Sequence, residues 1–313
     1  MAFTAEQKKA YAIQKSQDNQ DKLFGIIKEG LENMKDDFTY SWKMANGGFI
    51  KNIHTKKGYR GVNVWSGFFW TLQNNFTDPR VGTRKQLSKE GYSFRGLKAG
   101  TGLPILFFDT QKIEKENKKT GEPEEYYRRF WKWSEVFCVE QCEDYVPPED
   151  EEDSEPIPEH EMIAHCNAYI ESQETLTLKR EGMRAFYRVK EDLIQLPPHE
   201  LFIDSFGEAA TLLHEIAHST GHESRLNRKL GNGFGSKEYA FEELIAELSS
   251  IQLTLALGGK WNPNSVLEEN ANNIAYLQSW IKACEDKDGD LLKAFSESQK
   301  VCDYVLDKME KGE

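Results

Sequence analysis

The chain has 313 residues, of which 38% are hydrophobic and 12% aromatic, so it is long enough for two domains with cores of ordinary size. No run of about 18 apolar residues occurs, which argues against a membrane-spanning helix. The formal net charge is −12. Residues 1–142 hold 24 Lys or Arg against 17 Asp or Glu, residues 143–161 hold ten acidic residues and no Lys or Arg, and residues 162–313 hold 16 basic against 25 acidic residues. This pattern predicts a basic N-terminal domain, an acidic linker and an acidic C-terminal domain.

The first residues of the chain and its cysteines indicate a cellular compartment. Residues 1–20 are polar and lysine-rich and contain no apolar segment, unlike a secretory signal. The five cysteines are odd in number and scattered, which is typical of reduced thiols. We therefore expect a cytoplasmic protein.

The N-terminal domain is expected to be mixed α/β. Apolar residues recur at helical spacing over residues 1–37 and predict a helix that closes a core. The segments 59–65, 103–108 and 126–139 are apolar and rich in β-forming residues, and they predict strands. Residues 83–91 predict a short basic helix that ends at Gly91.

Basic residues are concentrated between positions 43 and 98, where 11 Lys or Arg face only Asp78 and Glu90. Aromatic residues are interleaved with them. A basic groove that contacts phosphates, with exposed rings on which bases stack, binds single-stranded nucleic acid without sequence preference. The alternative is a basic surface over an aromatic core, and most of the rings must be core residues.

Residues 143–161 consist largely of Pro, Glu and Asp and predict an extended linker. After it we expect a helix at residues 162–171 and short strands near 175–178, 185–189 and 192–196. Zinc peptidases bind an extended substrate at the edge of a strand in this position. Two further helices are expected over residues 270–284 and 291–309.

The segment 208–218, which reads EAATLLHEIAH, predicts a helix, and Gly221 supplies a stop. His214 and His218 are four residues apart, so they project from one face of this helix. Glu215 lies beside them. In this H-E-x-x-H arrangement the two imidazoles bind a metal and the glutamate acts as general base on a water molecule. The alternative is an amphipathic helix that carries two ordinary histidines.

A catalytic zinc site usually has three protein ligands. The next predicted helix places Glu243 and Glu247 on one face, while Glu242 points elsewhere. We assign Glu243 as the third ligand and Glu247 as the acceptor of a hydrogen bond from a ligating imidazole. His222 is the rival ligand, although it lies beyond the expected end of the helix, and an ordinary acidic helix face is the alternative for both glutamates.

Two histidines and a carboxylate accept either zinc or manganese; zinc is our first expectation for the one divalent metal, and manganese is the alternative. Arg225 and Arg228 follow the motif closely. They are candidates for binding a substrate carboxylate or an oxyanion, or else they pair with acidic neighbours.

The strings HEIAHSTGHESRLNR and FGSKEYAFEELIAELSS resemble the peptidase domain of the ArdC-type antirestriction proteins of mobile elements such as plasmids. The motifs YRGVNVWSG and VFCVEQCE and the basic loop near Lys98 resemble that family's N-terminal single-stranded-DNA-binding domain, although the loop KAGTG departs from the family's more charged version. The resemblance covers nearly the whole chain, and its C-terminal motifs are the more specific.

The resemblance implies a two-domain α+β protein with a zincin-like C-terminal domain, which binds entering single-stranded DNA and protects it from restriction. It also implies the metal ligands His214, His218 and Glu243. The candidate DNA contacts, taken from the basic cluster and the matching motifs, are Lys56, Lys57, Tyr59, Arg60, Asn63, Trp65, Arg84, Lys85, Arg95 and Lys98.

Three functions remain open at this point. The first joins single-stranded-DNA binding to a metal-dependent peptidase. The second is a DNA-binding shield whose metal site is not catalytic. The third is a metallopeptidase that cleaves a regulatory protein and whose basic domain binds a protein instead of DNA.

Overall fold

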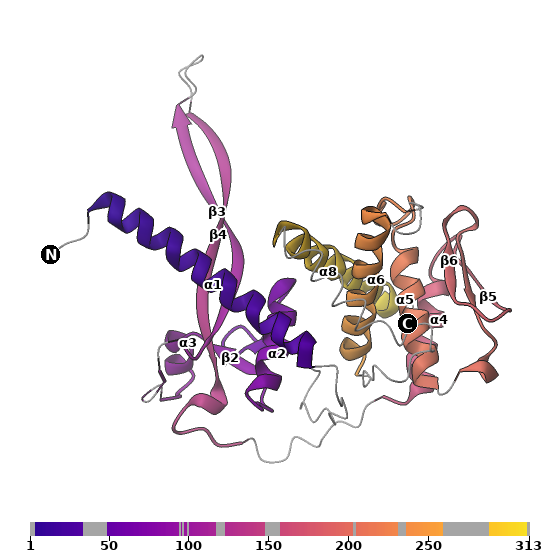
Figure 1. The fold of residues 1–313 in the computed structure, drawn as a ribbon, viewed down its shortest axis with the longest axis horizontal. Coiled ribbons are helices and arrows are strands. Elements are labelled where there is room, and N and C mark those ends of the chain that lie inside the picture. The colour runs from indigo at the N-terminus through magenta and orange to yellow at the C-terminus, as the bar shows by residue number, and fades with distance from the viewer. Residues whose placement is uncertain are drawn as a thin grey trace. The chain divides into compact units, whose positions relative to one another are not determined.

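The computed structural model describes residues 4–33, 49–93, 95, 97–98, 100–116, 123–147, 157–202, 205–230, 236–258 and 288–311. They form two compact units, which we describe separately (Figure 1). The first unit groups Met1–Ile27, Ile50–Tyr59 and Asn63–Pro147, and the second groups Lys28–Phe49, Arg60–Val62 and Pro148–Glu313. Both units mix helices with a sheet, as the expected α+β class requires. None of the described helices combines the length and hydrophobicity that are needed to cross a bilayer.

The first unit is built around a four-stranded sheet of order β1-β2-β4-β3. Its strands are β1 (Lys51–Asn52), β2 (Arg80–Gly82), β3 (Leu103–Glu116) and β4 (Pro123–Cys138). β1 and β2 are parallel, whereas β4 runs antiparallel to both β2 and β3. The pairing of β3 with β4 extends from Leu103 opposite Val136 to Glu116 opposite Pro123, so the two strands form the long twisted ribbon of Figure 1. The strands predicted near residues 103 and 126 are confirmed.

Helices α1 (Ala5–Asn33) and α2 (Val62–Gln73) belong mainly to the first unit, and α3 (Arg84–Lys89) belongs to it entirely. A 3-10 turn follows β4 at Val139–Gln141. The predicted helix at the N-terminus is confirmed. So is the short basic helix: Thr83 and Gln86 form a capping box at its start, and Gly91 follows its end with a φ of 91°. The structure does not describe residues 34–37, which belonged to the first of these predictions.

The strand predicted at residues 59–65 is wrong, because this stretch leads into α2. Trp65, Phe68 and Phe69 are at most 2% exposed, and Phe68 meets both other rings. A helix that is buried on several faces carries an almost continuous apolar run. Periodicity cannot distinguish such a run from a buried strand.

The second unit contains a three-stranded sheet of order β5-β7-β6, in which β5 is parallel and β6 antiparallel to β7. Its strands are β5 (Thr177–Arg180), β6 (Phe186–Arg188) and β7 (Leu193–Leu196), with 3-10 turns at Val189–Glu191 and His199–Leu201. Its helices are α4 (Glu159–Glu171), α5 (Ser205–Ser219), α6 (Lys237–Ala256) and α8 (Asp288–Lys311). The predicted strands and the helix near residue 291 are confirmed. The helix expected over residues 270–284 lies outside the described residues.

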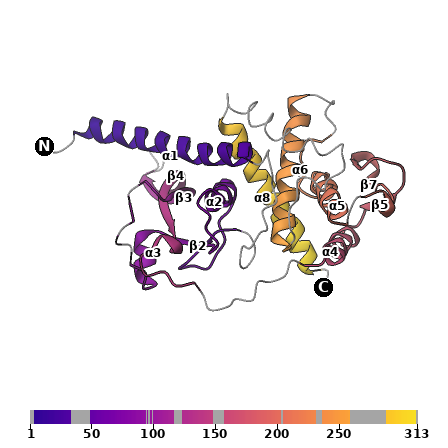
Figure 2. The ribbon, with the colours of Figure 1, turned by 60° about the horizontal axis from the view of Figure 1, so that its bottom comes forward.

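Helix α5 is the centre of this unit. It packs against α4, α6, β6 and β7, and Figure 2 shows it beside α4 and α6. Leu212, Leu213 and Ile216 of α5 are fully buried. The Ser250 hydroxyl of α6 donates a hydrogen bond to the carbonyl of Ala210 at 2.9 Å. The buried contacts and this bond fix the two helices side by side, and the candidate metal ligands lie on these two helices.

Candidate metal centre

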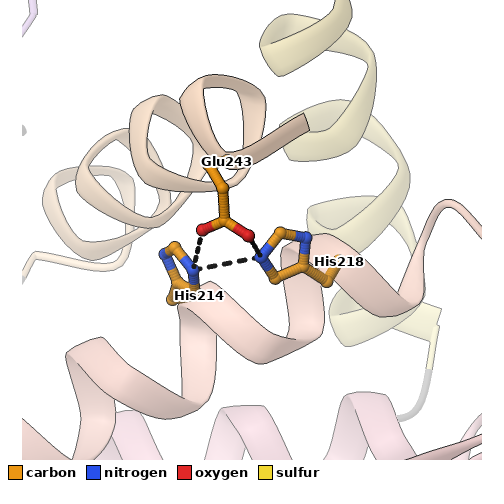
Figure 3. A group of neighbouring side chains, drawn as sticks. All are labelled: His214, His218 and Glu243. Carbon is orange, nitrogen blue, oxygen red and sulfur yellow. Dashed lines mark hydrogen bonds and ion pairs between the residues drawn. The ribbon is translucent and has the colours of Figure 1, made fainter. Parts of the chain in front are cut away.

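Two turns of α5 and one of α6 bring three potential ligands together (Figure 3). His214 Nε2 and His218 Nε2 lie 3.1 Å apart. The Glu243 carboxylate reaches both rings, at 3.6 Å from His214 Nε2 and 3.5 Å from His218 Nε2. One donor atom from each residue lies within 4.8 Å of the others, and no other such group occurs in the part of the chain that the structure describes.

The second nitrogen of each ring faces a different carboxylate. His214 Nδ1 lies 3.2 Å from Glu247, and His218 Nδ1 lies 3.4 Å from Glu242. When Nδ1–H donates to these carboxylates, the lone pair of each Nε2 points toward Glu243. Two imidazole nitrogens and a carboxylate oxygen in this arrangement fit a divalent metal.

The same contacts set the charge of the cluster. Although burial alone would lower the pKa of both histidines, the neighbouring carboxylates raise the pKa of His214, and they raise that of His218 to about 9. Burial would raise the pKa of Glu243, but its contacts with the two rings hold it well below its usual range. Because metal ligands must be deprotonated, a cation that binds here displaces protons from the histidines.

Glu215 lies in the helix turn between the two histidines and is 6% exposed. Burial raises the pKa of its carboxyl, although the two histidines and a hydrogen bond from the backbone N–H of Tyr187 act against this. A carboxylate with a raised pKa is suited to accept a proton near neutral pH.

The expectation that Glu242 points elsewhere is wrong, because its carboxylate lies against His218 Nδ1 and also pairs with Arg228. Each candidate histidine ligand needs a partner for its second nitrogen, and Glu247 alone can serve only one of the two rings. The signal was the surplus of glutamates around the ligand in the string EELIAE.

His222 is not part of the donor group. Its Nδ1 lies 2.8 Å from the hydroxyl of Ser224, two residues further on. Helix α5 has ended at Ser219, as the position of Gly221 predicted, but not through a left-handed glycine. A Cβ at Gly221 would lie 2.8 Å from side-chain carbons of Leu230, so a larger residue at this position would require the Leu230 side chain to shift.

Models of two families match the chain. That of the N-terminal domain of anti-restriction factor ArdC covers residues 17–137, and that of the zincin-like metallopeptidases covers residues 164–297. Crystal structures of the antirestriction ArdC protein from the R388 plasmid have the same fold over 93% of this chain. The metal-free structure gives a TM-score of 0.67 at 25% identity over 98% of that chain, and the Mn(II)-bound structure gives 0.68 at 28% over 97%.

The chain is an ArdC-type protein. The expected two-domain fold with a zincin-like second domain is confirmed by the same matches. Among curated proteins, DNA primase TraC of Escherichia coli is 32% identical over an alignment of 275 positions, which covers 83% of the ArdC-type chain and 24% of TraC. An uncharacterized protein of Sinorhizobium fredii, y4eC, is 28% identical over 81% of the ArdC-type chain and 80% of its own length. The chain thus spans about a quarter of the TraC primase.

The strand that directly precedes α5 in the ArdC-type chain is β7, which is the central strand of its sheet. The expectation of a free strand edge at this place is therefore wrong for β7. The edge strand next to the candidate base is β6, because the backbone N–H of Tyr187 reaches Glu215. The order of the strands in the chain did not predict that β6 is the edge strand. β7 is the last of the three strands in the sequence, yet it lies between β5 and β6 in the sheet.

Arg225 of the ArdC-type chain pairs with Asp192, and the two side chains are 3% and 6% exposed. Asp192 also accepts hydrogen bonds from Thr175 at 2.5 Å and from the hydroxyl of Tyr187 at 2.7 Å. Of the two roles considered for Arg225, the structure therefore favours pairing with an acidic neighbour. Burial would raise the pKa of Asp192, but these partners lower it to about 2.

This network predicts a pH-dependent contribution to stability. Because the pKa of Asp192 is lowered from 3.8 to about 2 on folding, the ionised carboxylate stabilises the fold above pH 3.8, and this contribution of about 2 kcal/mol is lost as the pH falls through 2. Asp192→Asn should cost about 3–5 kcal/mol at neutral pH, since it leaves a buried arginine unpaired. Urea unfolding of the wild type and of Asp192→Asn should show that the difference between their free energies of unfolding becomes smaller toward pH 2. A difference that stays constant with pH would contradict the pairing of an ionised Asp192 with Arg225.

The candidate DNA contacts of the ArdC-type chain divide by exposure. Six are exposed, namely Lys56, Lys57, Arg60, Lys85, Arg95 and Lys98. Tyr59 is half-buried, and its hydroxyl accepts a hydrogen bond from the side-chain amide of Asn52 at 3.1 Å. The guanidinium of Arg84 lies over the ring of Phe137, 4.9 Å from the ring centre. Arg60 is exposed but groups with the second unit, where it pairs with Asp303 of α8.

Two of the candidates, Asn63 and Trp65, are buried, at 7% and 2% exposure. Asn63 exchanges two hydrogen bonds with the backbone of Leu106 in β3, and Trp65 packs on Phe68. These two side chains hold α2 in the core and do not fit a contact with DNA. Exposed rings occur instead on β4, where Tyr127 and Trp131 are 67% and 53% exposed. Their even spacing along a strand puts both on one face, which alternation in the sequence could have indicated.

Proposed function

We propose that this antirestriction-family protein binds single-stranded DNA through its N-terminal unit and hydrolyses peptide bonds at the metal centre. The observation that carries the peptidase part is the convergence of His214, His218 and Glu243, with Glu215 beside them, in a zincin-like domain. The Mn(II) of the related R388 structure supports a divalent metal. We keep zinc as the first expectation, because this donor set is common in zinc peptidases.

Each side chain of the candidate site would have a separate role in hydrolysis. When bound, a divalent cation supplies Lewis-acid chemistry, in which it lowers the pKa of a water molecule and polarises a carbonyl. His214 and His218 would hold it through Nε2, and Glu243 would bring a negative charge to the same point. The Glu215 carboxylate would take the proton of the attacking water and deliver it to the leaving amine.

The DNA-binding part rests on the N-terminal unit. The family model for this region and the exposed lysines and arginine support it. Basic residues that contact phosphates bind single-stranded and duplex DNA alike. Exposed rings such as Tyr127 and Trp131 favour single-stranded DNA, because only unpaired bases offer a free face for stacking.

One purified sample tests both parts. Metal content is measured by elemental analysis, and binding of single-stranded and duplex oligonucleotides is titrated at several salt concentrations. We expect one divalent metal per chain, tighter binding of the single strand, and an affinity that falls steeply with salt. Absence of binding to either DNA at low salt would favour the third function, a peptidase whose basic domain binds a protein.

Charge reversal of exposed lysines should weaken DNA binding in a graded way. The variants are Lys57→Glu, Lys85→Glu and Lys98→Glu. If the lysine contacts a phosphate of single-stranded DNA, its variant should reduce the slope of log K against log salt by about 0.7. Lys190→Glu is the matched control, because Lys190 is also exposed but lies in the second unit. Equal effects of the control and of the three variants would mean that only net charge matters.

A further inference from the structure

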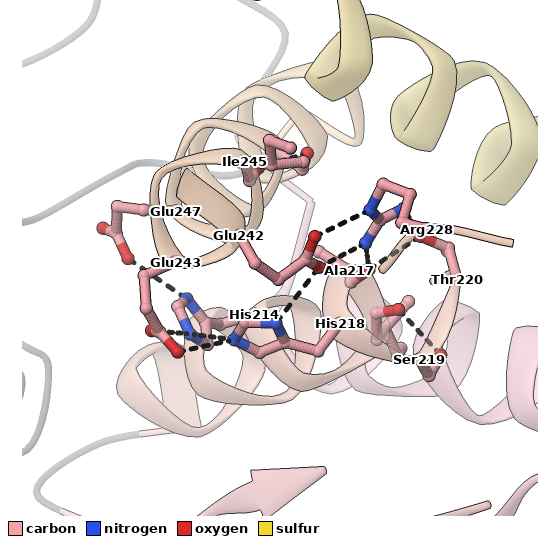
Figure 4. Close-up of polar contacts among 12 residues, drawn as sticks. His214, Ala217, His218, Ser219, Thr220, Arg228, Glu242, Glu243, Ile245 and Glu247 are labelled. Atoms are coloured by element: carbon pink, nitrogen blue, oxygen red, sulfur yellow. Dashed lines mark hydrogen bonds and ion pairs between the residues drawn. The ribbon is translucent and has the colours of Figure 1, made fainter. Parts of the chain in front are cut away.

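The carboxylate of Glu242 bridges a candidate metal ligand and an arginine (Figure 4). Its Oε1 lies 3.4 Å from His218 Nδ1 and 2.6 Å from Arg228 Nη2, and its Oε2 lies 3.0 Å from Arg228 Nε. The pair is therefore bidentate, and the two side chains are 11% and 8% exposed. A buried, bidentate arginine holds a carboxylate in one orientation.

Arg228 itself is fixed by the end of α5. Its Nη1 donates to the hydroxyl of Thr220 at 2.7 Å, and its Nη2 donates to the carbonyl of Ala217 at 2.8 Å. The arginine thus links the residues that follow the metal-binding turn to α6, which carries both Glu242 and Glu243. At the level of His218, this side chain adds a polar connection to the packing of the two helices.

A second pair in the same unit shows which part of this arrangement is special. Arg225 and Asp192 are even more buried than Arg228 and Glu242, and Arg225 also donates to α5, at the carbonyl of Ser219. The structure gives this pair no contact with either imidazole of the centre. Both pairs therefore anchor the chain beyond α5, but only the pair of Glu242 and Arg228 touches a candidate ligand.

We propose that Glu242 and Arg228 are positioning residues of the metal centre. Glu242 accepts the Nδ1 proton of His218, which fixes the ring with Nε2 toward Glu243, and Arg228 keeps the carboxylate at that place. Removing such a partner of a ligating histidine typically lowers metal affinity by about 10–100-fold. This inference rests on the proposed metal centre.

The test measures metal affinity and ring geometry apart from activity. The dissociation constant for Zn(II) or Mn(II) is obtained by competition with a chelator, the visible spectrum is recorded with Co(II), and the thermal stability of the metal-free protein is measured. Glu242→Ala should weaken metal binding about 10–100-fold and alter the Co(II) spectrum. Glu242→Gln keeps an oxygen acceptor for Nδ1–H and should recover part of the affinity. Arg228→Lys keeps the charge but loses the bidentate geometry, so its loss should be intermediate.

Asp192→Asn is the control, since it should lower thermal stability and leave the metal dissociation constant and the Co(II) spectrum unchanged. If Glu242→Ala does not fold, the isosteric variant Glu242→Gln and the charge-conserving variant Arg228→Lys serve in its place. Smaller losses of metal affinity are expected for these two. If the wild type binds the metal and the Glu242 and Arg228 variants bind it with the same affinity, this inference alone is overturned. Absence of metal binding in the wild type would overturn the proposed function as well.

Discussion

Replacing Glu243 with alanine is expected to abolish metal binding at micromolar concentrations. The loss should exceed about 100-fold, because even the outer partners of ligating histidines account for about 10–100-fold. Glu243 is the only carboxylate in the described part of the chain that lies within reach of both His214 Nε2 and His218 Nε2. Isothermal titration of the metal-free protein with Zn(II) and with Mn(II) measures the effect.

Glu238→Ala provides the control for this experiment. Glu238 is an exposed glutamate of the same helix, α6, and lies outside the donor group. It should leave the metal affinity at the wild-type value. A Glu243 variant that retained this affinity would show that the third ligand is another group or a water molecule.

The second large effect is expected for Glu215→Gln. The variant keeps the shape of the side chain and all three candidate ligands, so it should still bind metal. Cleavage of an unfolded protein substrate such as casein should fall by about 10²–10⁴-fold, the usual contribution of a positioned general base. Metal content and initial cleavage rates are measured on the same preparation, with the exposed Glu223→Gln as control.

The Glu215 variant also separates the two DNA-binding hypotheses. Persisting cleavage would show that another group moves the proton. Protection of incoming DNA in cells that is unaffected by both Glu215→Gln and His214→Ala would favour a shield whose metal site is not catalytic. Protection that disappears in both variants would tie the antirestriction effect to hydrolysis.

The sequence predicted the grouping of the candidate metal ligands better than the exposure of the candidate DNA contacts, for a physical reason. The relation between His214 and His218 is local, because a spacing of four residues fixes their faces on any helix. The choice of Glu243 needed one further step, the pairing of α5 with α6. The direction of Glu242 was missed because it depends on Arg228, which reaches it from a separate loop.

The N-terminal unit illustrates what local patterns omit. Lys57 and Trp65 both belonged to a basic and aromatic segment, yet one is exposed and the other is in the core. Exposure depends on packing among distant segments, such as the bonds of Asn63 to β3. The same dependence on packing made an apolar run part of helix α2. The β-forming residues at 103–108 and 126–139 did predict strands, but β3 continues to Glu116, beyond the predicted segment.

The three candidate ligands lie on two helices that are joined by more than fifteen residues of intervening chain. A cation held by both helices would act as a reversible cross-link of the folded state. At a free concentration of about 100 times its dissociation constant, it would add about 2.7 kcal/mol to the free energy of unfolding. The supply of metal would then govern how long the protein survives proteolysis in the cell, independently of any turnover at the site.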